Sequence, residues 1–326
     1  MNSLTGELNQ AGHKTARAPA PGRLGSTDFR GTVDPHGDHP PAPGRYHLYA
    51  SLACPLAHRV LIARMLKGLQ QCIGVSVVDP LPDAHGWHFS DAPGCEPDFV
   101  NQARRLSELY AKARPGCTDP GTVPMLWDCE RGSIVNNHPT DLLRLLNHAF
   151  DDFAVYPEVD LWPAALHGHI DDLNARLDAD VDGAIREAWH AVVPAARGQA
   201  LQRLSGALEW LDGELAGQRY LACDAPTEPD VRLFTTLVRF DAAYHACIGG
   251  TERRITEYRH LSGYLCDLYQ TPGFGDTVNM THIRQHFGNH RAGTPAGLLG
   301  AREELAFLRP HDRERLGAPQ QHRQAG

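Results

Sequence analysis

The feature that most constrains the fold is a change of hydrophobic pattern near residue 150. Before it, short apolar runs typical of strands alternate with stretches of helical spacing, whereas from residue 158 onward every apolar pattern is helical. Five leucines there recur three and four positions apart, as along one face of a helix: Leu201, Leu204, Leu208, Leu211 and Leu215. We therefore predict a small α/β domain over residues 45–150 and an all-helical domain over residues 151–290.

The order of elements narrows the fold of the first domain. The predicted elements are a strand at 46–50, a helix at 55–69, a strand at 73–78, a helix at 99–112, strands at 123–127 and 132–135, and a helix at 137–147. This order is that of a thioredoxin-like unit. In the second domain, Thr227 followed three residues later by Asp230 is a capping-box variant that predicts the start of a helix. A further helix is predicted over 255–269.

Composition limits the environment and the partners. Residues 1–44 are rich in Gly, Pro and Ala and are interpreted as an N-terminal arm, and the charged stretch 291–326 as a loose tail. A formal net charge of −8 argues against a nucleic-acid or membrane-surface binder. No apolar run approaches the roughly 20 residues that span a bilayer. The first 22 residues lack the apolar segment of a secretory signal, so we expect a cytoplasmic protein.

Cys54 is the candidate nucleophile among eight cysteines, which include no CxxC pair and no zinc-finger spacing. The other seven are interpreted as small buried thiols. Cys54 follows a predicted strand and directly precedes Pro55, a residue favoured at the first position of a helix. A helix N-terminus stabilises an anion, and His58 and Arg59 would add positive potential, so we expect a lowered thiol pKa. The alternative is an inert core cysteine at the end of a strand.

Pro124 supports the interpretation of Cys54 as a nucleophile. It lies in Thr122-Val-Pro-Met-Leu126, at the start of a predicted strand. In thioredoxin-like folds a cis-proline at this place stands beside the nucleophile, and its neighbour's backbone pairs with a bound thiol. Cis X–Pro bonds are uncommon and tend to occur at functional turns. The alternative for Pro124 is a proline in an edge strand.

Several motifs in order resemble one known family. They are ACPLAHR after a strand, GWHF, TVPMLWD, SIVNN and RLFTTLVRFDAAY. The chain resembles the Xi class of the glutathione transferases, the glutathionyl-hydroquinone reductases, from about Ser26 to about His290. The resemblance implies a thioredoxin-like N-terminal domain, an all-helical glutathione-transferase C-terminal domain, and a homodimer formed through the helical domains. It also implies glutathione, or another low-molecular-weight thiol, as co-substrate.

The resemblance assigns roles to individual residues. Cys54 matches the nucleophile that removes a thiol from a glutathionyl-hydroquinone. Trp87 matches a tryptophan that packs on glutathione, and Val123 and Pro124 match a backbone clamp for the thiol. Tyr244 matches a tyrosine that helps to stabilise the thiolate.

The chain departs from the family pattern in the pocket. His138 and Pro139 replace a Glu-Ser pair that holds the γ-glutamyl group, and Pro removes a backbone donor. Arg186 stands where the family has a proton-donating tyrosine, and arginine is a poor general acid. Phe287 replaces a later tyrosine. We therefore expect a divergent member that acts on a quinone-like or aromatic molecule. Two alternatives remain open: an enzyme repurposed for specialised metabolism without glutathione, and a non-catalytic small-molecule binder.

Three histidines at i, i+4 and i+8 raise the question of a metal site: His282, His286 and His290. The Xi pattern has histidines at equivalent places without requiring a metal, and Gly288 is expected to break the helix before the third. No metal is expected.

Overall fold

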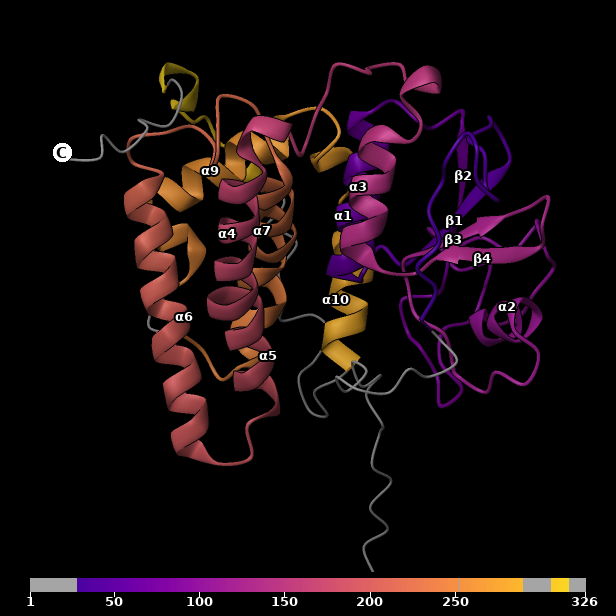
Figure 1. Cartoon of the computed structure of the whole chain (residues 1–326). Coiled ribbons are helices and arrows are strands. Elements are labelled where there is room, and N and C mark those ends of the chain that lie inside the picture. Colours follow the sequence, from indigo (N-terminus) through magenta and orange to yellow (C-terminus); the bar gives the residue numbers. More distant parts are fainter. Residues whose placement is uncertain (1–27, 252, 290–305, 317–326) are drawn as a thin grey trace, which may run out of the picture.

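Four short strands form one mixed sheet in the computed structural model, which describes residues 28–251, 253–289 and 306–316 (Figure 1). The strands are β1 (Tyr46–Ala50), β2 (Ile73–Val77), β3 (Met125–Asp128) and β4 (Ser133–Asn136). Their order in the sheet is β2-β1-β3-β4, with β1 and β2 parallel and the other two pairs antiparallel. Because β1 and β3 are the inner strands, the chain segments at their ends are held from both sides. This is the predicted thioredoxin-like sheet.

Helices cover the sheet as the element order predicts. They are α1 (Pro55–Leu66), α2 (Leu106–Ala113) and α3 (Pro139–His148). Figure 1 shows α1 and α3 side by side between the sheet and the second domain, while α2 lies on the far side of the sheet. Helix α1 is therefore in contact with both domains, which places its N-terminus at their junction.

The second domain is helical. Its helices are α4 (His167–Leu177), α5 (Gly183–His190), α6 (Pro194–Glu214), α7 (Glu228–Arg239), the short α8 (His245–Cys247), α9 (Arg259–Gln270) and α10 (Met280–Asn289). Two π-helical turns interrupt them, η3 (Asp178–Asp182) before α5 and η4 (Phe240–Tyr244) after α7. Helix α7 packs against α1, and α10 packs against η4. The two π-helical turns thus lie in the part of this domain that faces the first.

The capping box at Thr227 is confirmed. Asp230 accepts hydrogen bonds from the Thr227 backbone N–H (2.9 Å) and hydroxyl (3.0 Å) at the start of α7. Its second oxygen accepts from the Leu221 N–H (2.9 Å) and the Tyr264 hydroxyl (2.7 Å). The completely buried Asp230 therefore joins α7, the preceding loop and α9.

One predicted helix is too long. The stretch 99–112 is helical only from Leu106, because Asp98 organises the residues before it into a turn. The Asp98 carboxylate accepts the N–H groups of Val100 (3.1 Å), Asn101 (3.2 Å) and Ala103 (3.2 Å). Asp side chains that bond nearby backbone groups compete with helix formation in this way.

Two other expectations about helices are wrong. Gly288 does not break its helix, since α10 continues to Asn289, and His290 lies outside the described residues. The helix predicted over 255–269 is divided into a short 3-10 turn, Ile255–Glu257, and α9.

The described parts of the two flanking segments are packed against the domains. Residues 29–31 run beside β4, where the Gly31 N–H donates to the Val135 carbonyl (2.8 Å). A Cβ at Gly31 would lie 2.6 Å from that oxygen, so only glycine allows this approach. In the region expected to be a loose tail, residues 306–316 are docked, and the buried Arg313 donates to backbone carbonyls after α6.

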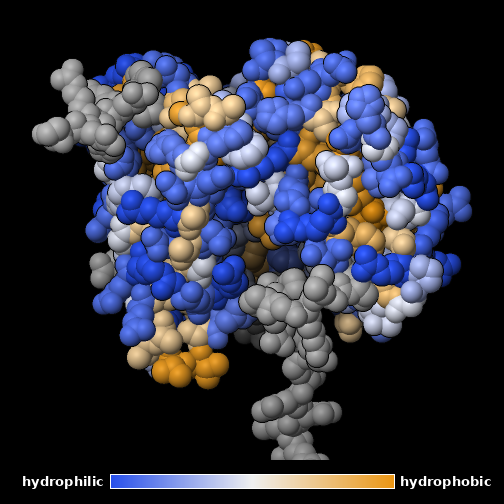
Figure 2. Space-filling view, in the orientation of Figure 1, coloured by the Kyte–Doolittle hydropathy of each residue, from blue (hydrophilic) through white to orange (hydrophobic). Residues whose placement is uncertain are grey.

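The face of the molecule seen in Figure 2 is mostly hydrophilic, with an apolar patch where α5 leads into α6. Val192 (95% exposed) and Val193 (58%) lie in that connection. Among the residues that the structure describes, no helix has both the length and the apolar character that a membrane crossing requires.

Candidate active site

Cys54 is the residue at which β1, α1 and the second domain come together. It is the N-cap of α1, with Pro55 at the first helical position as predicted. The backbone N–H groups of Leu56 and Ala57 face its sulfur and favour the thiolate. The residue as a whole is partly exposed, while its sulfur is enclosed by protein.

The local charge balance differs from the expected one. Burial raises the pKa of the Cys54 thiol, although the two N–H groups and the guanidinium groups of Arg239 and Arg59 act in the opposite direction. His58 adds no positive charge, because burial holds the pKa of its imidazole well below the usual value. The expected lowering of the Cys54 pKa is therefore wrong, since enclosure of the sulfur outweighs the helix N-terminus.

This balance predicts a pH dependence for the reactivity of Cys54. Because the thiolate is the reactive form and its pKa is raised, we expect the alkylation rate to keep rising above about pH 8.5, the usual thiol value. Mass spectrometry of the Cys54 peptide after iodoacetamide treatment, with glutathione as the reference thiol, measures this rate. A plateau already reached below pH 7 would contradict the prediction.

The loop before β3 places a backbone carbonyl at the sulfur. The Val123–Pro124 peptide bond is cis, as predicted. The Cys54 thiol donates to the Val123 carbonyl, with 3.8 Å between sulfur and oxygen. Because β3 lies between β1 and β4, the alternative of an edge-strand proline does not apply. The two candidate thiol-binding residues Val123 and Pro124 are therefore adjacent to the candidate nucleophile.

A cluster of aromatic rings lies across the domain junction. Trp87 stacks on His286 of α10, with ring centroids 5.6 Å apart and planes inclined by 14°. Phe287 makes edge contacts with Tyr244 (5.2 Å between centroids) and with Trp189 of α5 (5.8 Å). The cluster therefore joins the loop of the first domain that carries Trp87 to three segments of the second. Such a surface suits a flat aromatic ligand.

Tyr244 is positioned by the π-helical turn η4, a type of turn that is frequent at functional sites. It is 7% exposed, and burial raises the pKa of its hydroxyl. The electrostatic partners of this hydroxyl include Arg239 and Cys54. Tyr244 therefore keeps its proton at neutral pH and can donate a hydrogen bond.

The N-terminus of α3 shows what replaces the expected Glu-Ser pair. His138 is the N-cap, its Nδ1 lies 3.6 Å from an Asp141 oxygen, and its backbone N–H donates to Asn136 (2.7 Å). Asp141 also pairs with Arg30 of the N-terminal arm. A half-buried carboxylate that is paired with Arg30 thus lies one turn after the position of the expected Glu-Ser pair.

Arg186 is exposed on α5, and no hydrogen bond or ion pair joins it to a residue that the structure describes. It lies three positions before Trp189, so the two residues share one face of the helix. Trp189, not Arg186, contacts the aromatic cluster.

Comparison with known proteins identifies the family. Residues 194–265 match the family model for the glutathione S-transferase C-terminal domain. The chain is 39% identical over 297 residues to glutathionyl-hydroquinone reductase YqjG of Escherichia coli, covering 90% of this chain and 87% of that protein. The chain belongs to the Xi-class glutathione transferase and glutathionyl-hydroquinone reductase family.

Solved structures agree with this assignment. A Xi-class transferase from Natrialba magadii superposes with a TM-score of 0.82 at 40% identity, covering 89% of this chain and 92% of that one. The glutathione-bound structure of YqjG from Escherichia coli gives a TM-score of 0.76 at 40% identity, covering 79% and 87%. The transferase fold predicted for both domains is confirmed.

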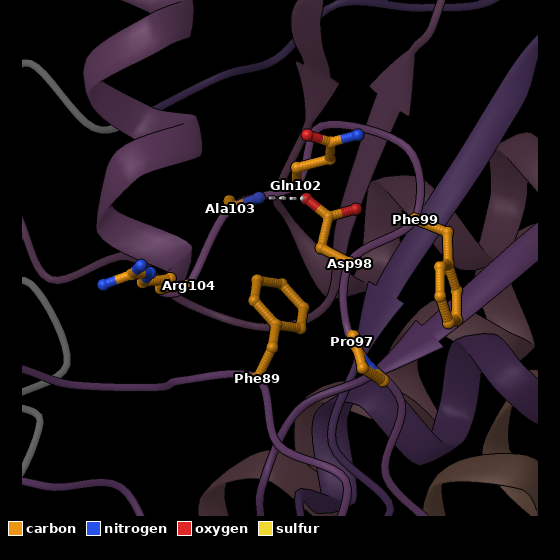
Figure 3. Close-up of a pocket in the computed structure, with 7 residues that line it drawn as sticks. All are labelled: Phe89, Pro97, Asp98, Phe99, Gln102, Ala103 and Arg104. Carbon is orange, nitrogen blue, oxygen red and sulfur yellow. Dashed lines mark hydrogen bonds between the residues drawn. The ribbon is translucent and has the colours of Figure 1, made fainter.

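One cavity of this Xi-class chain lies beside the candidate site rather than at Cys54. It measures about 340 Å³ and opens in the turn after Trp87, where Figure 3 shows the rings of Phe89 and Phe99. The Asp98 carboxylate at its edge is already bonded to the backbone of that turn. Cys54 does not line this cavity.

The histidines of α10 bind backbone in this Xi-class structure. The His282 ring nitrogen Nε2 lies 2.8 Å from the Pro93 carbonyl, and His286 Nδ1 lies 2.7 Å from the Pro80 carbonyl. These two hydrogen bonds hold α10 against the loop that contains Trp87. No group of three metal-ligating side chains occurs within the described part of the chain.

The sequence patterns pointed to neither Trp189 nor Arg239 as part of this site, and they raised His286 only as a possible metal ligand. All three lie in segments that the resemblance covers, within a few positions of residues that were candidates for the site. Trp189 is three positions from Arg186, His286 precedes Phe287, and Arg239 opens the RFDAAY motif. The expected buried thiols are also only partly as predicted, since Cys129 is exposed, and Cys223 and Cys247 are half-buried.

Proposed function

We propose that the protein removes the glutathionyl group from a glutathionylated hydroquinone or related aromatic molecule, with glutathione as co-substrate. The observation that carries this proposal is the Cys54 sulfur at the N-terminus of α1, beside the Val123 carbonyl and next to an aromatic cluster. The names of the relatives, and the glutathione bound to one of them, support the choice of substrate and thiol.

The reaction consists of two thiol exchanges. The Cys54 thiolate attacks the sulfur of the conjugate, so that the carbon–sulfur bond breaks, the aromatic carbon takes a proton, and the hydroquinone leaves. Cys54 is then in a mixed disulfide with glutathione. A second glutathione thiolate attacks this disulfide, releases glutathione disulfide and restores the Cys54 thiolate.

The surrounding residues have distinct parts in this proposal. The Val123 backbone and Trp87 hold the glutathionyl moiety. The Tyr244 hydroxyl, which keeps its proton, donates a hydrogen bond to the thiolate or to an oxygen of the aromatic substrate. Trp189 and Phe287 pack against the aromatic ring of the substrate.

Turnover with a defined conjugate tests the proposal. A purified S-glutathionyl-hydroquinone is incubated with enzyme and glutathione, and hydroquinone and glutathione disulfide are quantified by chromatography. We expect the two products in equal amounts. Absence of hydroquinone release under conditions in which the protein is folded would overturn the proposal.

A second candidate uses a thiol other than glutathione, and His138 is the observation that favours it. An imidazole and a proline stand where, by the resemblance, a carboxylate would hold the γ-glutamyl amine. A thiol without that amine would not need the missing carboxylate. The same turnover assay with other low-molecular-weight thiols in place of glutathione separates the two candidates.

Asp141 gives a prediction for the first candidate. If this carboxylate holds the γ-glutamyl amine in place of the missing one, Asp141→Asn should raise the KM for glutathione about tenfold, the effect of losing one charge-assisted hydrogen bond. The exposed Asp152→Asn provides the matched control, with an unchanged KM. An unchanged KM in both variants would leave glutathione without this contact and favour the second candidate.

We also propose a homodimer formed through the helical domains, as the resemblance implies. Light scattering of the purified protein tests it. A mass of about twice the 35.8 kDa of the chain is expected, and a monomer at micromolar concentration would contradict it.

A further inference from the structure

Arg239, the last residue of α7, is a completely buried guanidinium close to Cys54. Its Nε donates to the Ala53 carbonyl (3.1 Å) and its Nη2 to the Leu52 carbonyl (3.1 Å). Its Nη1 donates to the Thr235 carbonyl (2.8 Å). Two of these three acceptors belong to the two residues that precede Cys54, so Arg239 holds the turn that leads into α1.

The fourth partner of Arg239 is also uncharged. Nη1 lies 2.9 Å from His58 Nδ1. Because a guanidinium only donates, Nδ1 accepts, and His58 Nε2 donates to the Thr277 hydroxyl (2.8 Å). Burial holds the pKa of His58 well below its usual value, so the imidazole stays neutral in this chain of hydrogen bonds.

The charge of Arg239 therefore has no opposite charge in contact with it. No carboxylate lies within ion-pair distance of it in the described ranges 28–251, 253–289 and 306–316. Burial lowers its pKa to about 10, which still leaves it protonated at neutral pH. An unpaired buried charge is strongly unfavourable, so this position calls for a negative partner.

A second buried arginine near Cys54 differs from Arg239 because it has a carboxylate partner. Arg59 in α1 is also buried, yet its Nη2 donates to Asp182 at 2.6 Å, which offsets its charge. The charged or titratable groups that interact with Arg239 are Tyr244, Cys54, Arg59 and the neutral His58. Those that interact with the Cys54 sulfur are Arg239, Arg59 and Tyr244. Since Tyr244 keeps its proton, the Cys54 thiolate is the one available anion in this set.

We propose that the Arg239 guanidinium is the counter-charge of the Cys54 thiolate and a positioning residue for thiol exchange. The proposal rests on the proposed function, in which Cys54 is the nucleophile. It explains why a buried cation without a carboxylate is held by the residues immediately before that cysteine.

The test measures the reactivity of Cys54 and needs no substrate. The alkylation rate of the Cys54 peptide is followed across pH in wild type, Arg239→Met and Arg239→Lys. We expect the Arg239→Met variant to raise the thiol pKa and to slow alkylation at pH 7 about tenfold or more, and Arg239→Lys, which keeps the charge, to slow it about threefold or less. Arg313→Met is the matched control, because Arg313 is equally buried and also donates to backbone carbonyls.

A second measurement covers the case in which Arg239→Met does not fold. In wild type, the anionic reagent iodoacetate should react with Cys54 faster, relative to neutral iodoacetamide, than it does with free glutathione, because a fixed cation lies near the sulfur. A ratio equal to that of glutathione would overturn the proposal, as would an unchanged thiol pKa in a folded Arg239→Met variant. If wild-type Cys54 is alkylated as predicted but the wild-type protein does not release hydroquinone, the result would instead count against the proposed function.

Discussion

Serine in place of Cys54 should abolish the release of hydroquinone from a glutathionylated substrate. The oxygen of serine is not ionised at neutral pH and cannot form the mixed disulfide, so we expect kcat to fall by about a thousandfold or more. Steady-state assays of Cys54→Ser with a purified S-glutathionyl-hydroquinone measure the effect. The protein should remain folded, because the substitution preserves the size and the N-capping position of the residue.

Cys129→Ser is the matched control for this experiment, since Cys129 is an exposed thiol away from α1. It should leave turnover unchanged. If Cys54→Ser retained more than about a tenth of the wild-type rate, the nucleophile would have to be another group, and the proposed two-step exchange would fail.

The largest loss of stability is expected for Asp230→Ala. Four donors bond this buried carboxylate, and in its absence the N–H groups of Thr227 and Leu221 and the hydroxyl of Tyr264 would lose their acceptor. Buried donors left unsatisfied cost about 1–3 kcal/mol each, and the effects overlap, so we expect a loss of about 3–5 kcal/mol. Urea denaturation of the variant measures the free energy of unfolding.

Asp212→Ala provides the comparison. Asp212 also accepts two backbone N–H groups, those of His260 (2.7 Å) and Leu261 (2.8 Å), but it is half-buried and water can replace it. Its loss should cost about 1 kcal/mol. Equal destabilisation by both substitutions would mean that the burial of Asp230 is not what makes it important.

The candidate nucleophile Cys54 and the cis-proline beside it could be predicted because each has a local signal in the sequence. Cys54 precedes Pro55, which starts a helix, and Pro124 precedes a strand. These two signals lie 70 residues apart in sequence, and only the pairing of β1 with β3 brings them together. The thioredoxin-like element order implied that pairing, so the sequence was sufficient to predict that Cys54 and Val123 lie close together.

The electrostatic environment of Cys54 could not be predicted in the same way. The helix N-terminus and Arg59 are visible in the sequence, but the burial of the sulfur is not. His58 was expected to be positive, and only its burial against Arg239 makes it neutral. The sign of a pKa shift depends on desolvation, which is a property of the packed domains.

Tertiary packing also explains the residues that were missed. Arginine is rarely fully buried, so nothing in the sequence marks Arg239 as a core residue. The π-helical turns η3 and η4 change the register of α5 and α8, and helical spacing alone therefore does not indicate which side chains face the junction. Trp189 contacts the aromatic cluster, whereas Arg186, one turn earlier, is exposed.

Intact mass after incubation with glutathione disulfide tests the central claim most directly, using wild type, Cys54→Ser and Cys129→Ser. We predict one glutathione adduct that is present in wild type and in Cys129→Ser, is absent from Cys54→Ser, and is removed by added glutathione. Other low-molecular-weight disulfides are tested in parallel, and an adduct with one of them alone would keep the mechanism and change the co-substrate. If no disulfide formed an adduct at Cys54, the assignment of Cys54 as the thiol-exchanging nucleophile would be wrong.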